Sequence, residues 1–438
     1  MTAFERLALD GGTPRLTADP VAWWPQFTSD DDLVAIQAAR RIGLHLEPSG
    51  RRALTGGPVA TLERRWAAAT GRTEAIACAT VAVGAKLFAV GLELAPGDEV
   101  ITLAGAAVAG PLASLGIVMV PVDVHPRTLQ MDPAAVAAAV TVRTRAVIAV
   151  DLYGTTADYR ALAAVTEGHD LVLVEDGSAS IGASFDRRPV GSLGTTSLCS
   201  LPTETASGVV AAGTIYTTDD RRQGANARRS MLIDDPLGTT SADGDRTWAG
   251  PVADGSPLLG ASSAGSSAMA DVDADIALAL LARLDDDVAI RSANGDHLRR
   301  ALAPIPGIWM PEPVRGATHT YSSFPIIVVP DELGLPEAAA PALRDTIVDC
   351  MTAEGLWIEA ARRRGEPDLG DRFPVLGEAH AGGIVLGRSR SPFVGPSGVE
   401  DMERIAGCFA KILLDNRDRV RQLTLERTAP TIPTVRSP

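Results

Sequence analysis

The chain has 438 residues, a formal net charge of −14 and 46% hydrophobic residues, which together indicate a globular protein with more than one domain. The acidic balance argues against nucleic acid as the main partner, and no apolar run reaches the roughly 20 residues that would span a membrane. The four cysteines have no metal-ligand spacing and the first residues lack the pattern of a signal peptide, so we expect a cytoplasmic protein without a metal site.

Strand-like and helix-like runs alternate between residues 75 and 217. Continuous apolar runs separated by helical runs predict strands at 99–103, 118–124, 145–154 and 170–180. This pattern predicts a parallel sheet covered by helices on both faces. Ligands of such sheets bind beyond the carboxyl ends of the strands, so we expect Asp151, Asp176 and the loop at 200–207 near one crevice.

Composition and periodicity divide the rest of the chain. We predict an N-terminal arm, a large α/β domain with a long loop or lid, a smaller C-terminal α+β domain and a mobile polar tail. These cover residues 1–30, 31–300 (with the loop, rich in Gly, Ser, Asp and Pro, at 235–268), 301–415 and 416–438. Apolar spacing predicts a single long helix at 271–302.

Five segments carry a family resemblance. They are, in chain order, "LDGGTP", "LERRWAAATG", "ELAPGDEVITL", "VPVDVHPRTLQMDPAAVAAAV" and "VEDGSASIGASF". In order and spacing they resemble the nucleotide-sugar aminotransferases of the DegT/StrS class, which are fold type I pyridoxal phosphate (PLP) enzymes. The resemblance implies an α/β fold, with a large domain whose mostly parallel sheet is flanked by helices and a smaller C-terminal α+β domain. It also implies a homodimer that acts on a small molecule.

Most of that family's cofactor contacts are replaced in this sequence. The S-G-T phosphate-binding turn of the family matches Thr80, Val81 and Ala82, and a valine obstructs the close approach of backbone to phosphate. The ring that stacks on the pyridine corresponds to Ala107, which offers no π face. The family's glutamine and its N-x-R contact fall on residues without those side chains, at Ala179, Ser266 and Ala268.

The Schiff-base lysine of the family is missing from its expected place. The stretch "SLPTETASGVVAAG" at 200–213 resembles the S-F-x-x-x-K…G-E-G-G segment, which sets Thr205 at the lysine position with Glu204 beside it. Only Lys86 and Lys411 are lysines in the whole chain, and neither is an obvious substitute. Because fold type I chemistry needs that lysine for the Schiff base and for proton transfer, we predict that PLP binding is lost and expect no cofactor.

Three functions stay open at this point. The first is a PLP-independent enzyme that binds a natural-product or sugar-like intermediate and catalyses its cyclisation, elimination or isomerisation by acid–base chemistry. The second is a non-catalytic partner or regulatory subunit that pairs with an active sugar aminotransferase. The third is a sugar dehydratase or aminotransferase that uses pyridoxamine phosphate without a covalent link.

The candidate catalytic residues are carboxylates that the predicted crevice would bring together, at Asp176, Glu204 and Asp151. Burial would raise the pKa of such a group towards neutral pH. The candidate substrate-binding residues are Thr80, Ala107, Tyr153, Ser200, Thr205 and His319. The carboxylates also have plainer interpretations: Asp176, the pyridine-nitrogen partner in the family, as retained scaffold, Glu204 as a solvated loop residue, and Asp151 as a cap of the following turn.

Overall fold

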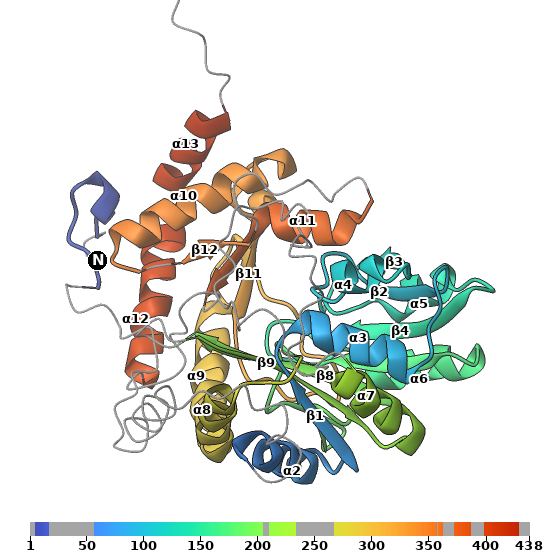
Figure 1. Cartoon of the computed structure of the whole chain (residues 1–438). Coiled ribbons are helices and arrows are strands. Elements are labelled where there is room, and N and C mark those ends of the chain that lie inside the picture. Colours follow the sequence, from blue (N-terminus) through green and yellow to red (C-terminus); the bar gives the residue numbers. More distant parts are fainter. Residues whose placement is uncertain are drawn as a thin grey trace, which may run out of the picture. The chain divides into compact units, whose positions relative to one another are not determined.

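A seven-stranded sheet lies at the centre of the larger of two units into which the computed structural model divides (Figure 1). The large unit comprises Pro25–Val288 and Pro313–Thr320, and the C-terminal unit comprises Met1–Trp24, Ala289–Glu312 and Tyr321–Pro438. The structure describes residues 5–16, 57–204, 210–233, 267–356, 358–361, 372–386 and 398–428. The chain therefore passes into the C-terminal unit twelve residues before the predicted domain boundary at 300/301 and returns once to the large unit.

The strand order of the large sheet is β1-β9-β8-β5-β4-β2-β3. Neighbouring strands from β3 to β8 run parallel, whereas β9 is antiparallel to both β8 and β1. The bounds are Glu74–Cys78 (β1), Glu99–Leu103 (β2), Val118–Val122 (β3), Thr144–Val150 (β4), Val172–Asp176 (β5), Thr196–Glu204 (β8) and Val210–Thr218 (β9). The mostly parallel sheet predicted from the sequence is confirmed.

Helices cover both faces of this sheet. Val147 and Ile148 point to opposite faces and are both fully buried, as are their neighbours on adjacent strands. Helix α3 packs against α4 and α7 on one face, and α5 packs against α6 on the other. The helices of the unit are α2 (Pro58–Thr70), α3 (Val81–Gly91), α4 (Ala109–Ser114), α5 (Pro133–Ala139), α6 (Tyr159–Gly168), α7 (Arg221–Ile233) and α8 (Asp271–Ala282).

Local capping explains where several of these helices begin. The Asp132 carboxylate accepts a hydrogen bond from the Ala134 N–H and Pro133 is the first residue of α5, as predicted. The Thr80 hydroxyl caps α3 and the Asp158 carboxylate caps α6 in the same way. The caps fix where each helix starts relative to the strand before it.

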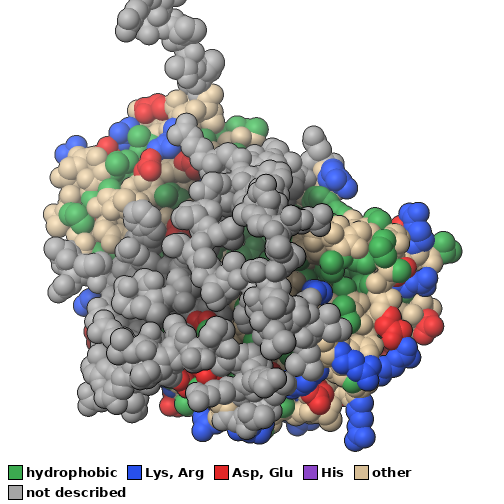
Figure 2. Space-filling model, in the orientation of Figure 1, with side chains coloured by type: hydrophobic (Ala, Val, Ile, Leu, Met, Phe, Trp, Pro, Cys, Tyr) green, Lys and Arg blue, Asp and Glu red, His purple; other side chains and the backbone are tan. Residues whose placement is uncertain are grey.

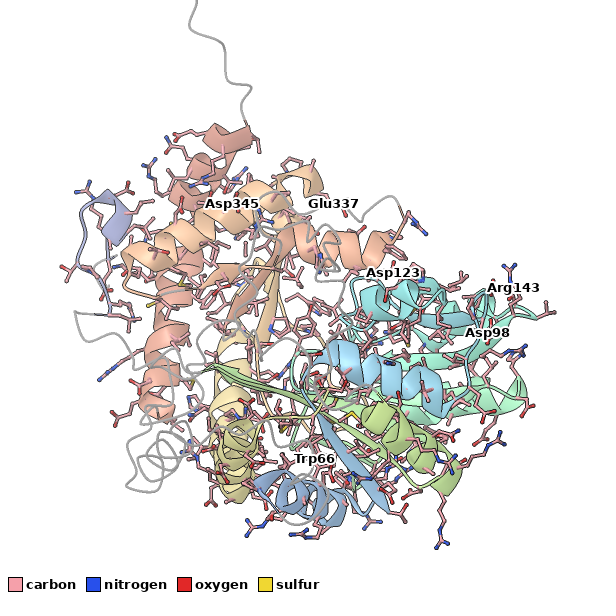
Figure 3. All side chains as sticks on the ribbon, in the orientation of Figure 1. Trp66, Asp98, Asp123, Arg143, Glu337 and Asp345 are labelled. Carbon is pink, nitrogen blue, oxygen red and sulfur yellow. The ribbon has the colours of Figure 1, made fainter. Side chains whose placement is uncertain are left out.

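The two ends of the sheet differ in their side chains. Asp98 and Arg143 mark the amino-terminal edge, where they precede β2 and β4 (Figure 3). The edge strand β3 is less covered than the central strands, and hydrophobic side chains gather on the surface near α4 and β3 (Figure 2), where Leu115 and Val118 are exposed. The opposite, carboxyl-terminal edge holds Asp151, Asp176 and Ser200.

A four-stranded antiparallel sheet in the order β10-β11-β13-β12 forms the core of the C-terminal unit. Its strands are Ile308–Trp309 (β10), Phe324–Val328 (β11), Glu359–Ala360 (β12) and Gly383–Leu386 (β13). Its helices are α9 (Leu284–Leu302, which starts in the large unit), α10 (Ala340–Ala353), α11 (Pro374–Gly382), α12 (Val399–Ala410) and α13 (Arg417–Thr428). This is the predicted smaller α+β domain, to which the N-terminal segment adds the buried side chain of Leu7.

Two sequence predictions differ from the structure here. The helix predicted at 271–302 is two helices, because the backbone leaves helical geometry at Arg283, while the apolar spacing continues through the break. The tail predicted as mobile from residue 416 includes α13, which buries Val420 and Thr424 against its unit. The rest of the tail and residues 235–266 of the predicted lid lie outside the described residues.

Residues 200–204 form part of a strand, whereas the sequence analysis placed them in a loop. Strand β8 continues to Glu204 and pairs with β9 through every residue, from Ser200 opposite Thr214 to Glu204 opposite Val210. The long β8–β9 ribbon is visible in Figure 1. Gly213 lies in it close to Met269: a Cβ at that position would lie 2.1 Å from the Met269 Cε and would displace the end of that flexible side chain.

Candidate active site

Asp176 is the last residue of β5 and lies at the carboxyl-terminal edge of the sheet. Its side chain is 6% exposed, and its Oδ1 accepts hydrogen bonds from the Ser178 hydroxyl at 2.5 Å and the Ser178 N–H at 3.2 Å. Both hydrogen bonds that this carboxylate accepts from described residues therefore go to one oxygen. Burial raises the pKa of Asp176 above its ordinary value, and the two Ser178 hydrogen bonds oppose that rise.

A row of hydroxyl groups runs from Asp176 across the neighbouring strands. The Ser178 Oγ also accepts the Ser200 N–H at 2.9 Å, and the Ser200 and Thr214 hydroxyl oxygens are 3.1 Å apart. The Ser178 hydroxyl accepts a hydrogen bond from Ser200 and donates one to Asp176, so it links β8 to that carboxylate. The structure thus brings Ser200 and Asp176 together through a residue that the sequence analysis did not select.

Asp151 has a different environment although it follows the neighbouring strand β4. It is 1% exposed; Oδ1 accepts the Ala157 N–H at 2.9 Å and the Tyr159 hydroxyl at 3.2 Å, and Oδ2 accepts the Ser180 hydroxyl at 2.5 Å. Burial, together with the nearby charge of Glu175, raises the pKa of Asp151 well above its ordinary value. Both carboxylate oxygens of Asp151 accept hydrogen bonds from buried protein groups, which is typical of a residue that caps a turn rather than of one that contacts a substrate.

Glu175 is buried beneath the site on the other face of β5. Its carboxylate accepts the Gly191 and Leu193 N–H groups and the Ser197 hydroxyl. Burial raises the pKa of Glu175, and these hydrogen bonds together with Arg72 oppose the rise. Arg72 donates to the Gly191 and Gly194 carbonyls and pairs with Asp219 at 2.7 Å, so the cluster fastens the turn before β8.

His319 lies beside the turn that contains Tyr153. An isolated bridge pairs Thr155 with His319, the Thr320 N–H donates to the Gly154 carbonyl at 2.7 Å, and the Thr155 hydroxyl donates to the Thr318 carbonyl at 3.1 Å. Tyr153 is half-buried and has a φ of +62°. The structure therefore joins two residues that are 166 positions apart and that the sequence analysis proposed separately for substrate binding.

Of the remaining candidates, the structure describes Thr80 and Ala107. Thr80 caps α3 and follows β1, and its carbonyl accepts the Cys78 thiol, which also donates to the Thr214 carbonyl. Ala107 is exposed in the turn after β2. Thr205 lies outside the described residues, and so does the Glu204 side chain, although the Glu204 backbone ends β8.

The structure does not bring Glu204 next to Asp176. Asp176 pairs with Leu198 on β8, and Glu204 comes six residues later on the same extended strand. At about 3.3 Å of rise per residue the two positions are roughly 20 Å apart along the strand. The expected pair of catalytic carboxylates fails because β8 stays extended where the sequence analysis placed a loop.

The two lysines of the chain, Lys411 and Lys86, lie in different surroundings. Lys411 is fully buried in the C-terminal unit, where its Nζ donates to the Glu354 carboxylate at 2.9 Å and the Thr13 carbonyl at 2.8 Å. Lys86 is on α3, two residues after Gly84, whose Cα packs against Thr214. Two residues turn an α-helix by about 200°, so the Lys86 side chain leaves α3 on the side away from the sheet.

Ser178 and Ser180 are hydrogen-bond partners of the candidate aspartates that the sequence analysis missed. Each donates a 2.5 Å hydrogen bond to one of the two strand-end aspartates, Asp176 and Asp151. A local signal exists for Ser178, because a serine two residues after an aspartate is typical of a turn that satisfies the carboxylate. Within the described residues, no group of three or more His, Cys, Asp and Glu side chains could share a metal ion.

The pattern of the DegT/DnrJ/EryC1/StrS aminotransferase family matches residues 45–363, which is well over half of the chain. The chain belongs to this family. Its sheet order and its two units are those of a fold type I aminotransferase, so the expected fold class is confirmed. Among the described residues, no helix is both long and apolar enough to cross a membrane.

Similar proteins include an aminotransferase, a regulatory protein and a structure solved with a sugar product. The L-glutamine:2-deoxy-scyllo-inosose aminotransferase of Micromonospora echinospora is 30% identical over 94% of this chain and 99% of its own length. A pleiotropic regulatory protein of Geobacillus stearothermophilus is 46% identical, but over 28% of this chain and 34% of its own. The solved structure of DesI with its TDP-sugar product is 25% identical, with a TM-score of 0.68 over 97% of this chain and 99% of that one.

A further solved structure supports the fold alone. That of 3-amino-5-hydroxybenzoic acid synthase is 23% identical, with a TM-score of 0.65 over 91% of this chain and 98% of that one. The sequence families and the structures therefore agree on the scaffold. The reaction has to be inferred from the residues at the carboxyl-terminal edge of the sheet.

Proposed function

We propose that the protein is a cytoplasmic enzyme that binds a sugar-like or cyclitol-like ketone at this edge and moves a proton on it with Asp176. The observation that carries the proposal is the state of Asp176: a buried carboxyl group with one oxygen fixed by Ser178 and a pKa raised by burial. A carboxylate in that environment is a stronger base than one in water, which suits proton abstraction beside a carbonyl.

The chemistry that Asp176 supplies is a proton transfer without redox change. The carboxylate takes a proton from the carbon next to the carbonyl, and the electron pair of that C–H bond passes to the carbonyl oxygen as an enolate. Return of the proton to another atom gives isomerisation, and loss of a neighbouring hydroxyl as water gives elimination. The hydrogen bonds from Ser178 to Oδ1 keep the Asp176 carboxylate in place while the proton moves.

The residues around the site do not fit covalently held PLP, the cofactor of this family's aminotransferases. The covalent link needs a lysine amine, yet Lys411 is enclosed in an ion pair of the C-terminal unit and Lys86 leaves the outer side of α3. The alanine at 107 supplies no ring to stack on a pyridine. We therefore propose a reaction that needs no Schiff base in this chain.

The substrate class is proposed from the relatives. The Micromonospora enzyme is named for 2-deoxy-scyllo-inosose, a cyclic polyhydroxylated ketone, and DesI was solved with a TDP-sugar. We propose a small molecule of this kind, from natural-product biosynthesis, as the substrate. The family also supports a homodimer as the working form, with a mixed dimer as the outcome that would favour a partner role.

Incubation with PLP is expected to give no lysine adduct. The purified chain should show no aldimine absorbance, and after borohydride treatment its peptide map should contain no pyridoxyl-lysine at either lysine position. A control aminotransferase treated in parallel should give the adduct in full. A stable adduct on Lys86 or Lys411 would contradict the proposal, and non-covalent retention of pyridoxamine phosphate through dialysis would favour the pyridoxamine-dependent alternative.

Asp176→Asn is expected to slow proton exchange at least about 100-fold, since general base catalysis contributes about 10²–10⁴. The assay follows deuterium entry from D₂O into the carbon beside the carbonyl of 2-deoxy-scyllo-inosose by NMR. Ser178→Ala should move the pH profile of exchange upwards, because the hydrogen bonds from Ser178 hold the pKa of Asp176 down. Ser180→Ala, which removes the matching hydroxyl from Asp151, is the control and should leave that profile unchanged.

The proposal fails if Asp176→Asn exchanges deuterium at the wild-type rate. A wild-type chain without exchange activity that co-purifies with an active sugar aminotransferase, and raises the activity of that enzyme, would instead establish the partner role.

A further inference from the structure

Tyr153 adopts a backbone conformation that a tyrosine rarely has. Its φ of +62° is left-handed, and Gly154 after it is left-handed as well, with a φ of +90°. A bulky residue stays in this conformation only where its surroundings fix it, and such strain concentrates at functional sites. Tyr153 lies two residues after Asp151, at the same edge of the sheet as Asp176.

Gln130 fixes the backbone on the near side of Tyr153. Its side-chain amide makes two hydrogen bonds with Leu152, donating from Nε2 to the carbonyl and accepting the N–H at Oε1, each at 3.1 Å. Gln130 is 1% exposed, although it comes from the segment before α5 and is 22 residues away in the chain. A buried glutamine whose amide binds both backbone polar groups of one residue determines the path of the chain into Tyr153.

The segment at 318–320 fixes the backbone that follows Tyr153. The Thr320 N–H and hydroxyl both donate to the Gly154 carbonyl, at 2.7 and 3.2 Å, and His319 bridges to Thr155. The left-handed tyrosine is therefore enclosed between two well-anchored peptide groups. Relaxation of its backbone would break hydrogen bonds on one side or the other.

Exposure separates Tyr153 from the other tyrosines. The chain has four, all within the described residues, and Tyr159, Tyr216 and Tyr321 are at most 4% exposed. Tyr321 is left-handed as well, with a φ of +48°, but it is buried, so Tyr153 is the one left-handed tyrosine that is half-buried. A ring with one apolar face and a polar tip suits a ligand that presents both C–H groups and hydroxyls.

We propose that Tyr153 is the specificity-determining contact for the cyclic polyhydroxylated ligand and that Gln130 is the positioning residue that holds it. The aromatic ring covers one face of the ligand ring at the edge of the sheet that carries Asp176. Gln130 acts through the Leu152 peptide and does not touch the ligand. This inference rests on the proposed function for the class of ligand.

Tyr153→Gly is the test, with 2-deoxy-scyllo-inosose as the probe and calorimetry and thermal unfolding as the measurements. We expect the midpoint of unfolding to rise by about 2 °C, because glycine relieves the left-handed strain. We expect affinity for the probe to fall at least about tenfold, because the ring contact is lost. Asp170→Gly is the matched control: Asp170 is exposed and left-handed at the opposite edge of the sheet, so this change should leave affinity unchanged.

Gln130→Met tests the positioning role. Alone it should lower affinity about as much as Tyr153→Gly does, while in the Tyr153→Gly background it should lower affinity no further, since the ring it positions is gone. Equal additive losses in the two backgrounds would overturn the positioning role. Wild-type affinity in Tyr153→Gly would overturn the inference and leave the proposed function standing, whereas a wild-type chain that does not bind the probe would overturn both.

Discussion

Lys411→Met is expected to lower the free energy of unfolding of the C-terminal unit by about 3–5 kcal/mol, the usual cost of removing one partner from a buried ion pair. The Lys411 ammonium and the Glu354 carboxylate are 2.9 Å apart and at most 1% exposed. Without the ammonium, Glu354 keeps the N–H groups of Ala8 and Arg15 but carries a buried charge with no counter-charge. Urea unfolding, followed by a probe in this unit, measures the loss.

The same substitution should release the N-terminal segment. Lys411 also donates to the Thr13 carbonyl, and the Leu16 N–H donates to the Glu354 carbonyl, so this pair anchors residues 8–16 to the unit. Amide exchange in that segment should rise together with the loss of stability. Lys86→Met, at the other lysine, is the control and should cost less than about 1 kcal/mol, the range of a half-exposed charged side chain. Equal losses of unfolding free energy in the two lysine variants would contradict the role of the buried ion pair.

Asp151→Ala is expected to lower the free energy of unfolding by about 3 kcal/mol, while Asp176→Ala should lower it by less than about 1 kcal/mol. The first leaves the Ala157 N–H and the Tyr159 and Ser180 hydroxyls without their acceptor, all of them buried. The second leaves only Ser178, which is partly exposed and can bond to water. Chemical denaturation of the two variants side by side gives the comparison.

The pH dependence of stability should separate the charge from the hydrogen bonds. A carboxyl group with a raised folded pKa favours the folded state at low pH, and this contribution is lost as pH rises from the unfolded value of about 4 through the folded value. Asp176→Asn keeps the acceptor for Ser178 and removes the charge. Its stability relative to wild type should therefore rise with pH across that window, to a gain of about 1 kcal/mol at neutral pH. A difference that does not vary with pH would show that burial of the charge has no cost.

The large loss for Asp151→Ala, the small loss for Asp176→Ala and the gain for Asp176→Asn at neutral pH would together separate scaffold from site. A residue that stabilises the fold loses stability when it is removed, whereas a functional carboxylate kept in a buried position costs stability that its removal returns. The sequence analysis treated Asp151 and Asp176 as equivalent strand-end candidates. Their hydrogen bonds distinguish them.

Local sequence was enough for the architecture of the large unit. The strands at 99–103 and 146–149 are buried at every residue, and hence on both faces, so the parallel sheet was predictable from neighbouring residues. The start of α5 at Pro133 was predictable for the same reason, because a cap acts within three residues. The chain contains only two lysines, which limits covalent attachment of PLP to two positions in any fold.

Only the tertiary structure decided which side chains meet. Continuation of β8 to Glu204 depends on pairing with β9, and it places the Glu204 backbone six residues along the strand from the partner of Asp176. The hydrogen bonds between Gln130 and Leu152 join residues 22 positions apart, and the ion pair between Lys411 and Glu354 joins residues 57 positions apart. Neither contact can be predicted from a short stretch of sequence. Secondary structure follows from sterics and burial along a few residues, whereas the partner of a buried polar group is set by which strands and helices pack together. For that reason the sequence by itself determined the scaffold and limited the chain to two lysines, and the fold determined that Asp151 caps a turn while Asp176, Ser178 and Tyr153 form the candidate site.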